Sequence, residues 1–222
     1  MFTLTYQTLK SRIQDILEND GTEFVAAIPN FINRAEQRLT RETDVIGLNV
    51  FAQTTFNIGD PFIDRPVDAL IVKNLNYKTN EGTRIQLLQM TNEYLNDYAS
   101  NRSEQGSPRY YANYGSDKLL VAPSPSSAST VEMEYVAQPP VLSSTTNETN
   151  YFTDYCGNAL LYASLVEACY YMKNPSAGQV WEAQYMREIN GLNNEARRSR
   201  RDDMIVAANP SGGEDNLMNG QP

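Results

Sequence analysis

The sequence contains carboxylates, cysteines and arginines in patterns that could support chemistry, but it contains no histidine. The lack of histidine removes the usual general base near neutral pH and the most common metal ligand in proteins. Its paired glycines, Gly212-Gly213, lack the Lys-Ser or Lys-Thr that a phosphate-binding loop requires. Most familiar hydrolases are therefore disfavoured, and we expect a protein that is not an enzyme and uses no cofactor.

Three aspartates at regular intervals, Asp60, Asp64 and Asp68, could in principle hold a cation. Their spacing differs from that of an EF-hand calcium loop, and Pro61 and Pro66 interrupt the segment. A plain solvated turn is the alternative, and we favour it. No metal site is predicted.

Glu167 and the two cysteines fall in a segment with an apolar helical pattern. A carboxylate on a mostly apolar helix needs a partner, and Arg34 or Arg38 of an earlier helix would supply one. A structural ion pair is therefore favoured over catalysis. Cys156 and Cys169 would lie roughly 20 Å apart along one predicted helix, too far for a disulfide. We expect two buried thiols.

A dense group of arginines near the C-terminus could bind phosphate groups or a protein surface. The segment Arg197-Arg198-Ser199-Arg200-Arg201 has no aromatic residues between the cations, and Asp202-Asp203 follows directly. At the end of a helix, these cations complement the helix dipole and can dock on an acidic surface of another protein, which we favour. Residues 201–222 are predicted to form a flexible arm that awaits a partner.

The elements that position these residues are helices at both ends of the chain and strands between them. Helical periodicity predicts segments over about 5–18, 22–43, 154–170 and 177–196. Pro29 implies either a kink or a new helix start inside the second segment. The three later helical segments supply a common core, so we predict a bundle made from both ends of the chain.

Between the helices the pattern changes to β-branched and aromatic residues with turn signals. Strands are predicted over about 49–56, 70–77, 83–88, 109–114, 118–122 and 130–137, with a short helix near 90–99. The predicted fold class is α+β, with a helical bundle formed by the N- and C-terminal helices, an inserted antiparallel β module and an extended C-terminal arm. We assign residues 1–47 and 150–200 to the bundle, 48–149 to the β-rich domain and 201–222 to the arm.

The helix over Pro29–Glu42 has an apolar face and a charged face. The apolar face carries Ile28, Ile32, Ala35 and Leu39. The charged face carries Arg34, Glu36, Arg38 and Arg41. Their mixed signs do not suit nucleic acid but do suit contact with the same helix of a neighbouring copy, so we predict a subunit interface there. An ordinary solvated face is the alternative.

The composition is that of an acidic globular protein, with 41% hydrophobic residues and a formal net charge of −9. This charge argues against nonspecific binding of nucleic acid or anionic membrane by the outer surface. We recognise no secretory signal and no apolar run long enough to span a bilayer, and expect folding in a reducing cytosol. The 14 tyrosines are typical of interfaces, although core packing explains many equally well.

With these pieces assembled, the chain resembles the head-to-tail adaptor proteins of short-tailed bacteriophages, the group that includes the tail tubular protein A type. The resemblance covers most of residues 5–195 and rests on the order and spacing of several segments. These segments are Ile28–Glu42, Ser107–Tyr111 followed by Lys118–Pro123, and Asn158–Ala168.

The resemblance implies a structural virion protein of the head–tail junction, made in the host cytoplasm. It implies a ring of about twelve copies beneath the portal protein, which forms part of the DNA channel and presents a platform for the tail nozzle protein. DNA would pass through without sequence-specific binding. The tail-facing β module would use Tyr110, Tyr111 and Tyr114. The portal-binding arm would use Arg197, Arg198, Arg200, Arg201, Met204, Ile205 and Val206.

Two other functions remain open. One is another head or tail completion protein of the same virion. The other is a carbohydrate- or receptor-binding β module on a helical stalk, which the aromatic strands suggest. A wet aromatic groove would favour the second, and a ring with shared helices would count against it.

Overall fold

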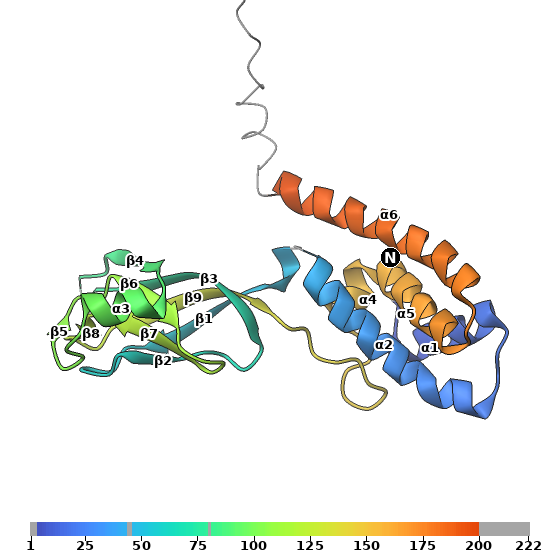
Figure 1. The fold of residues 1–222 in the computed structure, drawn as a ribbon, viewed down its shortest axis with the longest axis horizontal. Coiled ribbons are helices and arrows are strands. Elements are labelled where there is room, and N and C mark those ends of the chain that lie inside the picture. The colour runs from blue at the N-terminus through green and yellow to red at the C-terminus, as the bar shows by residue number, and fades with distance from the viewer. Residues whose placement is uncertain (1–3, 44–45, 80, 200–222) are drawn as a thin grey trace, which may run out of the picture. The chain divides into compact units, whose positions relative to one another are not determined.

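The computed structural model describes residues 4–43, 46–79 and 81–199. Contacts within the chain divide it into two compact units, which are drawn in Figure 1. The helical unit comprises Met1–Ile46 and Pro140–Pro222, and the β unit comprises Gly47–Pro139. Residues 140–149, expected in the β-rich domain, group with the helices in this division.

The helical unit is built around one buried helix. Its elements are α1 (Tyr6–Leu17), α2 (Thr22–Glu42), α4 (Tyr151–Tyr155), α5 (Gly157–Tyr171) and α6 (Pro175–Ser199). The central helix α5 is apolar almost all round, with Leu160, Leu165 and Cys169 fully buried, and it packs against α1, α2, α4 and α6. The predicted bundle of helices from both ends of the chain is therefore confirmed.

The helix α2 continues through its proline. Gly21 precedes the helix, Thr22 begins it, and Pro29 lies inside it without dividing it. A proline inside a helix removes one backbone hydrogen bond at a cost of about 3 kcal/mol. Ile28 and Ile32, on either side, are fully buried, and their burial offsets this cost.

The chain enters α5 through a short helix that we did not predict. Asn150 caps α4 by accepting hydrogen bonds from the N–H groups of Phe152 at 3.0 Å and Thr153 at 3.3 Å. The Thr153 hydroxyl accepts the Asn150 N–H in return, at 2.8 Å. The prediction of one continuous helix over about 154–170 is wrong, because this capping box starts α4 at Tyr151 and the helix is interrupted at Cys156.

The β unit contains one seven-stranded sheet and one short two-stranded pair. The sheet strands are β1 (Asn49–Thr55), β2 (Phe62–Asp64), β3 (Ala69–Lys78), β4 (Arg84–Gln89), β6 (Tyr110–Asn113), β7 (Lys118–Ala122) and β9 (Thr130–Ala137). Their order is β1-β9-β3-β4-β6-β7-β2. The short strands β5 (Gln105–Gly106) and β8 (Ser124–Pro125) pair in parallel, and a 3-10 turn, η1 (Ile46–Leu48), precedes β1.

Four of the predicted strands form two hairpins. Strands β3 and β4 pair antiparallel around a turn with Gly82 at φ +84°, and β6 and β7 do so around Gly115 at φ +87°. Glycine suits both turns because a side chain disfavours positive φ. Within the seven-stranded sheet, β4 and β6 depart from the antiparallel pattern and pair in parallel. The helix α3 (Asn92–Tyr98) lies between them in the chain and supplies the crossover that a parallel pair requires.

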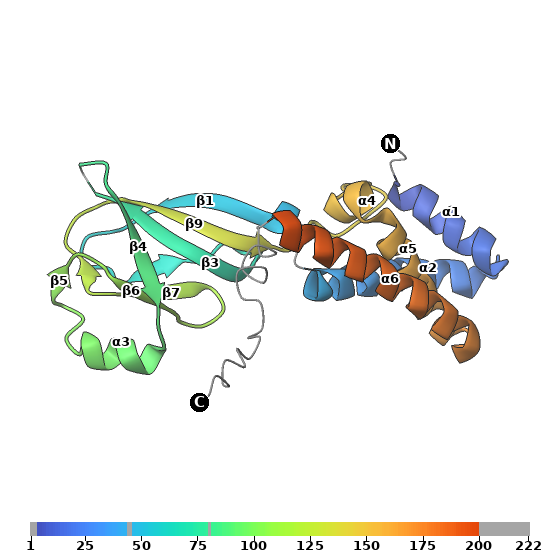
Figure 2. The same ribbon diagram turned by 90° about the horizontal axis from the view of Figure 1, so that it is seen from above.

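The core of the β unit lies inside the curled sheet, and α3 packs against β6 and β7 (Figure 2). Strand β9 shows the cleanest pattern, with Val131, Met133 and Tyr135 buried and the residues between them facing outward. Mixed helices and a predominantly antiparallel sheet confirm the α+β fold class.

Candidate protein-contact surfaces

Arg38 joins helices α2 and α6. Its guanidinium forms a two-pronged pair with Glu182, at 2.8 Å and 2.5 Å, and its Nε donates to Glu42 at 3.0 Å. The same guanidinium lies 4.2 Å above the ring centre of Tyr185, whose hydroxyl donates to Glu42 at 2.7 Å. We call these four residues the Arg38 cluster.

The electrostatics of the Arg38 cluster follow from its partial burial. Hydrogen bonds from Arg38 lower the pKa of Glu182. Burial, together with the bond to Glu42, raises the pKa of Tyr185. The predicted interface residue Arg38 is therefore engaged within its own subunit, where it fixes α6 against α2.

Glu36 is not on the charged surface of α2. Its side chain is only 6% exposed, and the prediction that it lies on the solvent-facing side is wrong. Its carboxylate accepts the side-chain N–H of Asn150 at 2.5 Å and the backbone N–H of Leu142 at 3.3 Å. Burial raises the pKa of Glu36 to about 7, although these two hydrogen bonds act in the opposite direction. This carboxylate ties residues 140–150 to the helices.

The predicted ion pair of Glu167 is present. Arg34 Nη1 lies 3.3 Å from Glu167 Oε2, and the Arg34 side chain is 70% exposed. Arg41 is exposed near the end of α2. Of the four residues assigned to a subunit interface, Arg34 and Arg41 thus have surface to offer a neighbour.

The described part of the arginine group lies at the end of α6. Arg197 and Arg198 are exposed in the last helical turn, where positive charge complements the helix dipole. The other arm residues are outside the described residues. These are Arg200, Arg201, Met204, Ile205 and Val206.

Three tyrosines form a surface cluster on the β unit. The rings of Tyr94 and Tyr98 on α3 are stacked, with centres 6.0 Å apart. Tyr110 of β6 meets both edge-on, at 5.4 Å and 4.9 Å. Tyr94 and Tyr98 are 41% and 45% exposed. We call this group the tyrosine cluster. The i,i+4 spacing of Tyr94 and Tyr98 on a predicted helix is a sequence signal for it.

The other predicted tyrosines of the β module differ in position. Tyr111 is buried in the core and has no surface to offer a partner. Tyr114 is 43% exposed, and its ring lies 5.0 Å from that of Phe62. Arg102 lies 5.8 Å from both ring centres, so a cation lies beside this aromatic pair.

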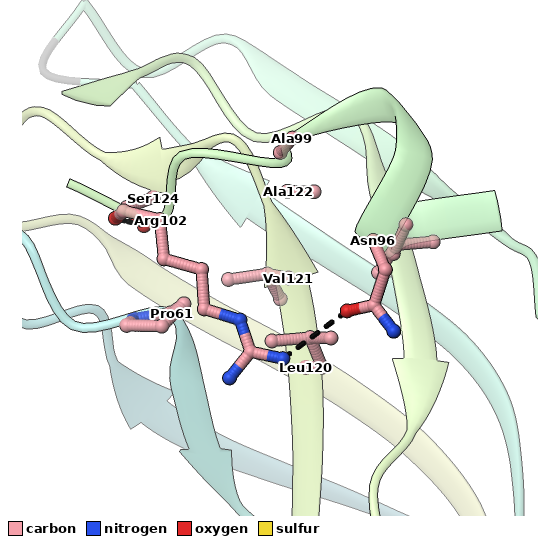
Figure 3. Close-up of a pocket in the computed structure, with 9 residues that line it drawn as sticks. Pro61, Asn96, Ala99, Arg102, Leu120, Val121, Ala122 and Ser124 are labelled. Atoms are coloured by element: carbon pink, nitrogen blue, oxygen red, sulfur yellow. Dashed lines mark hydrogen bonds between the residues drawn. The ribbon is translucent and has the colours of Figure 1, made fainter. Parts of the chain in front are cut away.

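A small cavity is lined in part by Arg102 and by residues of α3. Arg102 donates to Asn96 at 3.1 Å, and Figure 3 shows its guanidinium pointing toward that side chain. The cavity has a volume of about 10 Å³, which is room for about one water molecule. No aromatic ring of the described residues lines this cavity, and the rings of Tyr94, Tyr98 and Tyr110 pack against one another.

The three aspartates of the candidate cation site have separate partners. Asp60 accepts the Phe62 N–H at 2.9 Å, Asp64 pairs with Lys118 at 3.3 Å, and Asp68 accepts the Tyr135 hydroxyl at 3.1 Å. Within the described ranges, no three His, Cys, Asp or Glu residues gather as a metal site would need.

Both cysteines are buried free thiols, as predicted. Cys169 lies in α5, but Cys156 lies at the junction of α4 and α5 and not inside a common helix. Burial raises the pKa of Cys156 to about 11, which keeps it protonated and unreactive. None of the helices in the described part of the chain is long and apolar enough to cross a membrane.

Exposed arginines thus lie on the helical unit, and exposed tyrosines form a cluster on the β unit. Residues 4–209 match the family described as SU10 adaptor protein. The chain belongs to this family, a phage head-to-tail adaptor family, and the resemblance seen in the sequence is confirmed. A comparison with curated proteins gave no match.

Proposed function

We propose that this adaptor forms a ring of about twelve copies beneath the portal protein of the filled head and attaches the tail nozzle protein. The observation that carries the proposal is the family match over residues 4–209, which includes both units and the start of the arm. The proposed location is the head–tail junction of the virion.

The helical unit is the proposed wall of the ring. In this arrangement Arg34 and Arg41 contact the neighbouring copy, because their side chains are on the exposed side of α2. Glu36 and Arg38 contribute from within the subunit, by holding Asn150 and α6 in place. A rigid wall favours ring closure because fewer side chains need ordering on assembly.

The proposed portal contact is the arm that begins at the end of α6. Arg197, Arg198, Arg200 and Arg201 supply positive charge, and Met204, Ile205 and Val206 supply apolar surface. Charges of one sign steer binding to an acidic surface, and the apolar residues add burial. Many arms on one ring bind more strongly than a single arm because the sites are linked.

The β unit is the proposed platform for the nozzle protein. Exposed tyrosines combine large contact area with few rotatable bonds and are frequent at the centres of interfaces. The tyrosine cluster and the pair formed by Tyr114 and Phe62 are such surfaces. The net charge of −9 disfavours DNA binding, which suits a channel through which DNA must slide.

Native mass spectrometry of the purified protein, with and without portal protein, tests this proposal. We expect a monomeric or polydisperse protein alone and a closed ring on the portal. Deletion of residues 197–222 should abolish the complex. The matched control is deletion of residues 210–222, which retains all the arm residues named above. Unchanged portal binding after the longer deletion would exclude the arm as the portal contact.

A further inference from the structure

The short helix α3 presents two stripes of side chains to solvent. Tyr94 and Tyr98 form one stripe, at the i,i+4 spacing that brings side chains together on a helix. Glu93 and Asp97, both exposed, form the other stripe at the same spacing. Asp97 also follows Tyr94 by three residues, so the two stripes adjoin. The exposed rings of the tyrosine cluster are therefore bordered by two carboxylates.

These two carboxylates have no counter-charge in the part of the chain that the structure describes. Neither Glu93 nor Asp97 forms an ion pair there with a lysine or an arginine. Like charges at the i,i+4 spacing repel and destabilise a helix. The helix dipole favours Glu93 in the first turn but opposes Asp97 in the last turn, which holds no basic residue. A cation from outside α3 would relieve both effects at Asp97.

The Arg38 cluster shows how this chain combines the same groups around a cation. There the guanidinium lies 4.2 Å above the ring centre of Tyr185 and bonds to the carboxylates of Glu42 and Glu182. On α3 the tyrosine rings and two carboxylates are present, but no described cation lies over these rings. Guanidinium suits both kinds of group, because it stacks flat on aromatic rings and donates two parallel hydrogen bonds to a carboxylate.

Leu88 extends the same surface on the side of β4. Its side chain is 54% exposed, and the parallel register of β4 and β6 places it beside Tyr110. Tyr110 in turn meets the rings of Tyr94 and Tyr98. The exposed surface therefore changes from apolar on β4 to acidic on α3, with the tyrosine rings between them.

We propose that the tyrosine cluster binds an arginine of the tail nozzle protein. Its guanidinium stacks on the exposed tyrosine rings of α3 and pairs with Asp97, and an apolar residue next to it in that protein covers Leu88. An entirely apolar segment would desolvate Glu93 and Asp97 without a partner, and an acidic one would be repelled. This inference rests on the proposed role of the β unit as the nozzle platform, and it names the chemistry of the partner there.

The first test measures the binding of purified nozzle protein to heads that carry the portal and the adaptor. Asp97→Asn removes the charge and keeps the shape of the side chain, so it should weaken binding about tenfold or more and make it less dependent on salt. The matched control is Glu81→Gln, because Glu81 is an exposed acid in the turn between β3 and β4. It should bind normally. Asp97→Asn should remain folded by circular dichroism, because it removes a repulsion within α3.

The second test separates cation stacking from apolar contact. The double variant Tyr94→Leu/Tyr98→Leu keeps apolar side chains on α3 but removes the rings on which a guanidinium stacks. It should weaken nozzle binding about tenfold, because leucine offers a cation no negative ring face. Normal binding by this double variant would overturn the stacked arginine.

The third test identifies the partner residue directly. A photo-crosslinking residue in place of Leu88 should capture a nozzle peptide that contains an arginine. Replacing that arginine by glutamate should weaken binding to the unsubstituted adaptor, and Asp97→Arg should restore it in part because the two charges are exchanged.

The outcomes distinguish this inference from the proposed function. Crosslinks to the nozzle protein together with normal binding by Asp97→Asn would overturn the arginine and leave the nozzle platform standing. Crosslinks only to a second copy or to the portal would overturn both.

Discussion

The carboxylate of Glu36 on α2 accepts a hydrogen bond from the side-chain amide of Asn150, 114 residues further along the chain. Asn150 also donates to the Pro140 carbonyl at 3.0 Å and caps α4 with its side-chain oxygen. One buried carboxylate therefore holds the segment that returns from the β unit and sets the start of α4. Burial raises the pKa of this carboxylate, so we expect the stability of the helical unit to depend on pH.

The first prediction concerns this sensitivity. The folded-state pKa of Glu36, about 7, is above its ordinary value of 4.5, so the folded protein binds a proton more tightly than the unfolded chain. The free energy of unfolding should therefore fall as the pH rises from about 4.5 to 7, by about 3 kcal/mol. Glu36→Gln, which resembles the protonated acid, should remove this fall. Urea unfolding followed by the fluorescence of Trp181 on α6 measures it. If the free energy of unfolding changed with pH in the same way in Glu36→Gln and in the unsubstituted protein, Glu36 would not be the group responsible.

The second prediction separates Arg38 from Arg34. Arg38→Ala leaves Glu182 and Glu42 without their cation in a partly buried cluster, and should lower the free energy of unfolding by about 2–4 kcal/mol. Arg34→Ala is the matched control, because its side chain is 70% exposed and its single pair with Glu167 should contribute less than about 1 kcal/mol. A double-mutant cycle of Arg38→Ala with Glu182→Ala measures the coupling. Equal losses of stability in Arg38→Ala and Arg34→Ala would contradict a stabilising role of the Arg38 cluster.

Patterns within one element predicted much of the fold. Apolar spacing is sufficient to find the helices other than α4, and turn signals between the strands indicate both hairpins. The need of Glu167 for a cation points to Arg34 or Arg38, and Arg34 is the partner in the structure. Each of these inferences depends on local periodicity or on one strong physical requirement. They succeed because neighbouring residues on one face share one environment.

The position of Glu36 needed information from elsewhere in the chain. It lies four residues after Ile32 and three before Leu39, so its place on the apolar stripe is visible in the spacing. Its charge nevertheless favours a surface position unless a buried partner exists, and that partner, Asn150, comes from a distant cap. Likewise, the tyrosine cluster depends on the parallel pairing of β4 with β6, which local patterns do not determine.

The third prediction contrasts two adjacent tyrosines. Tyr111 is 2% exposed in the core of the β unit, so Tyr111→Ala should destabilise that unit by about 3–5 kcal/mol. Tyr110→Ala breaks up the surface cluster with Tyr94 and Tyr98, and should cost about 1–2 kcal/mol through the lost ring contacts. Unfolding followed by circular dichroism measures both changes. A larger loss of stability in Tyr110→Ala than in Tyr111→Ala would show that the tyrosine cluster belongs to the core of the β unit.

Attachment of the tail nozzle to virions that carry Tyr110→Ala distinguishes a role of Tyr110 in nozzle contact from a purely structural role. Virions with Tyr110→Ala should assemble heads with fewer attached tails although the adaptor remains folded, because the proposed contact surface is lost. Tyr155→Ala serves as a control, since it removes an exposed tyrosine of the helical unit, outside the proposed nozzle platform. Normal tail attachment in virions that carry Tyr110→Ala would exclude the tyrosine cluster from the nozzle contact.

The last prediction uses two glycines in different backbone conformations. Gly191 lies inside α6, and a Cβ added there would meet nothing within 4 Å, so Gly191→Ala should stabilise the helical unit by about 0.5–1 kcal/mol. Gly82→Ala is the control, because its φ of +84° is strained for alanine, and it should destabilise the β unit by about 1 kcal/mol although space is available. Trp181 fluorescence reports the first change and circular dichroism the second. Destabilisation by Gly191→Ala would mean that α6 does not form a continuous helix at this position.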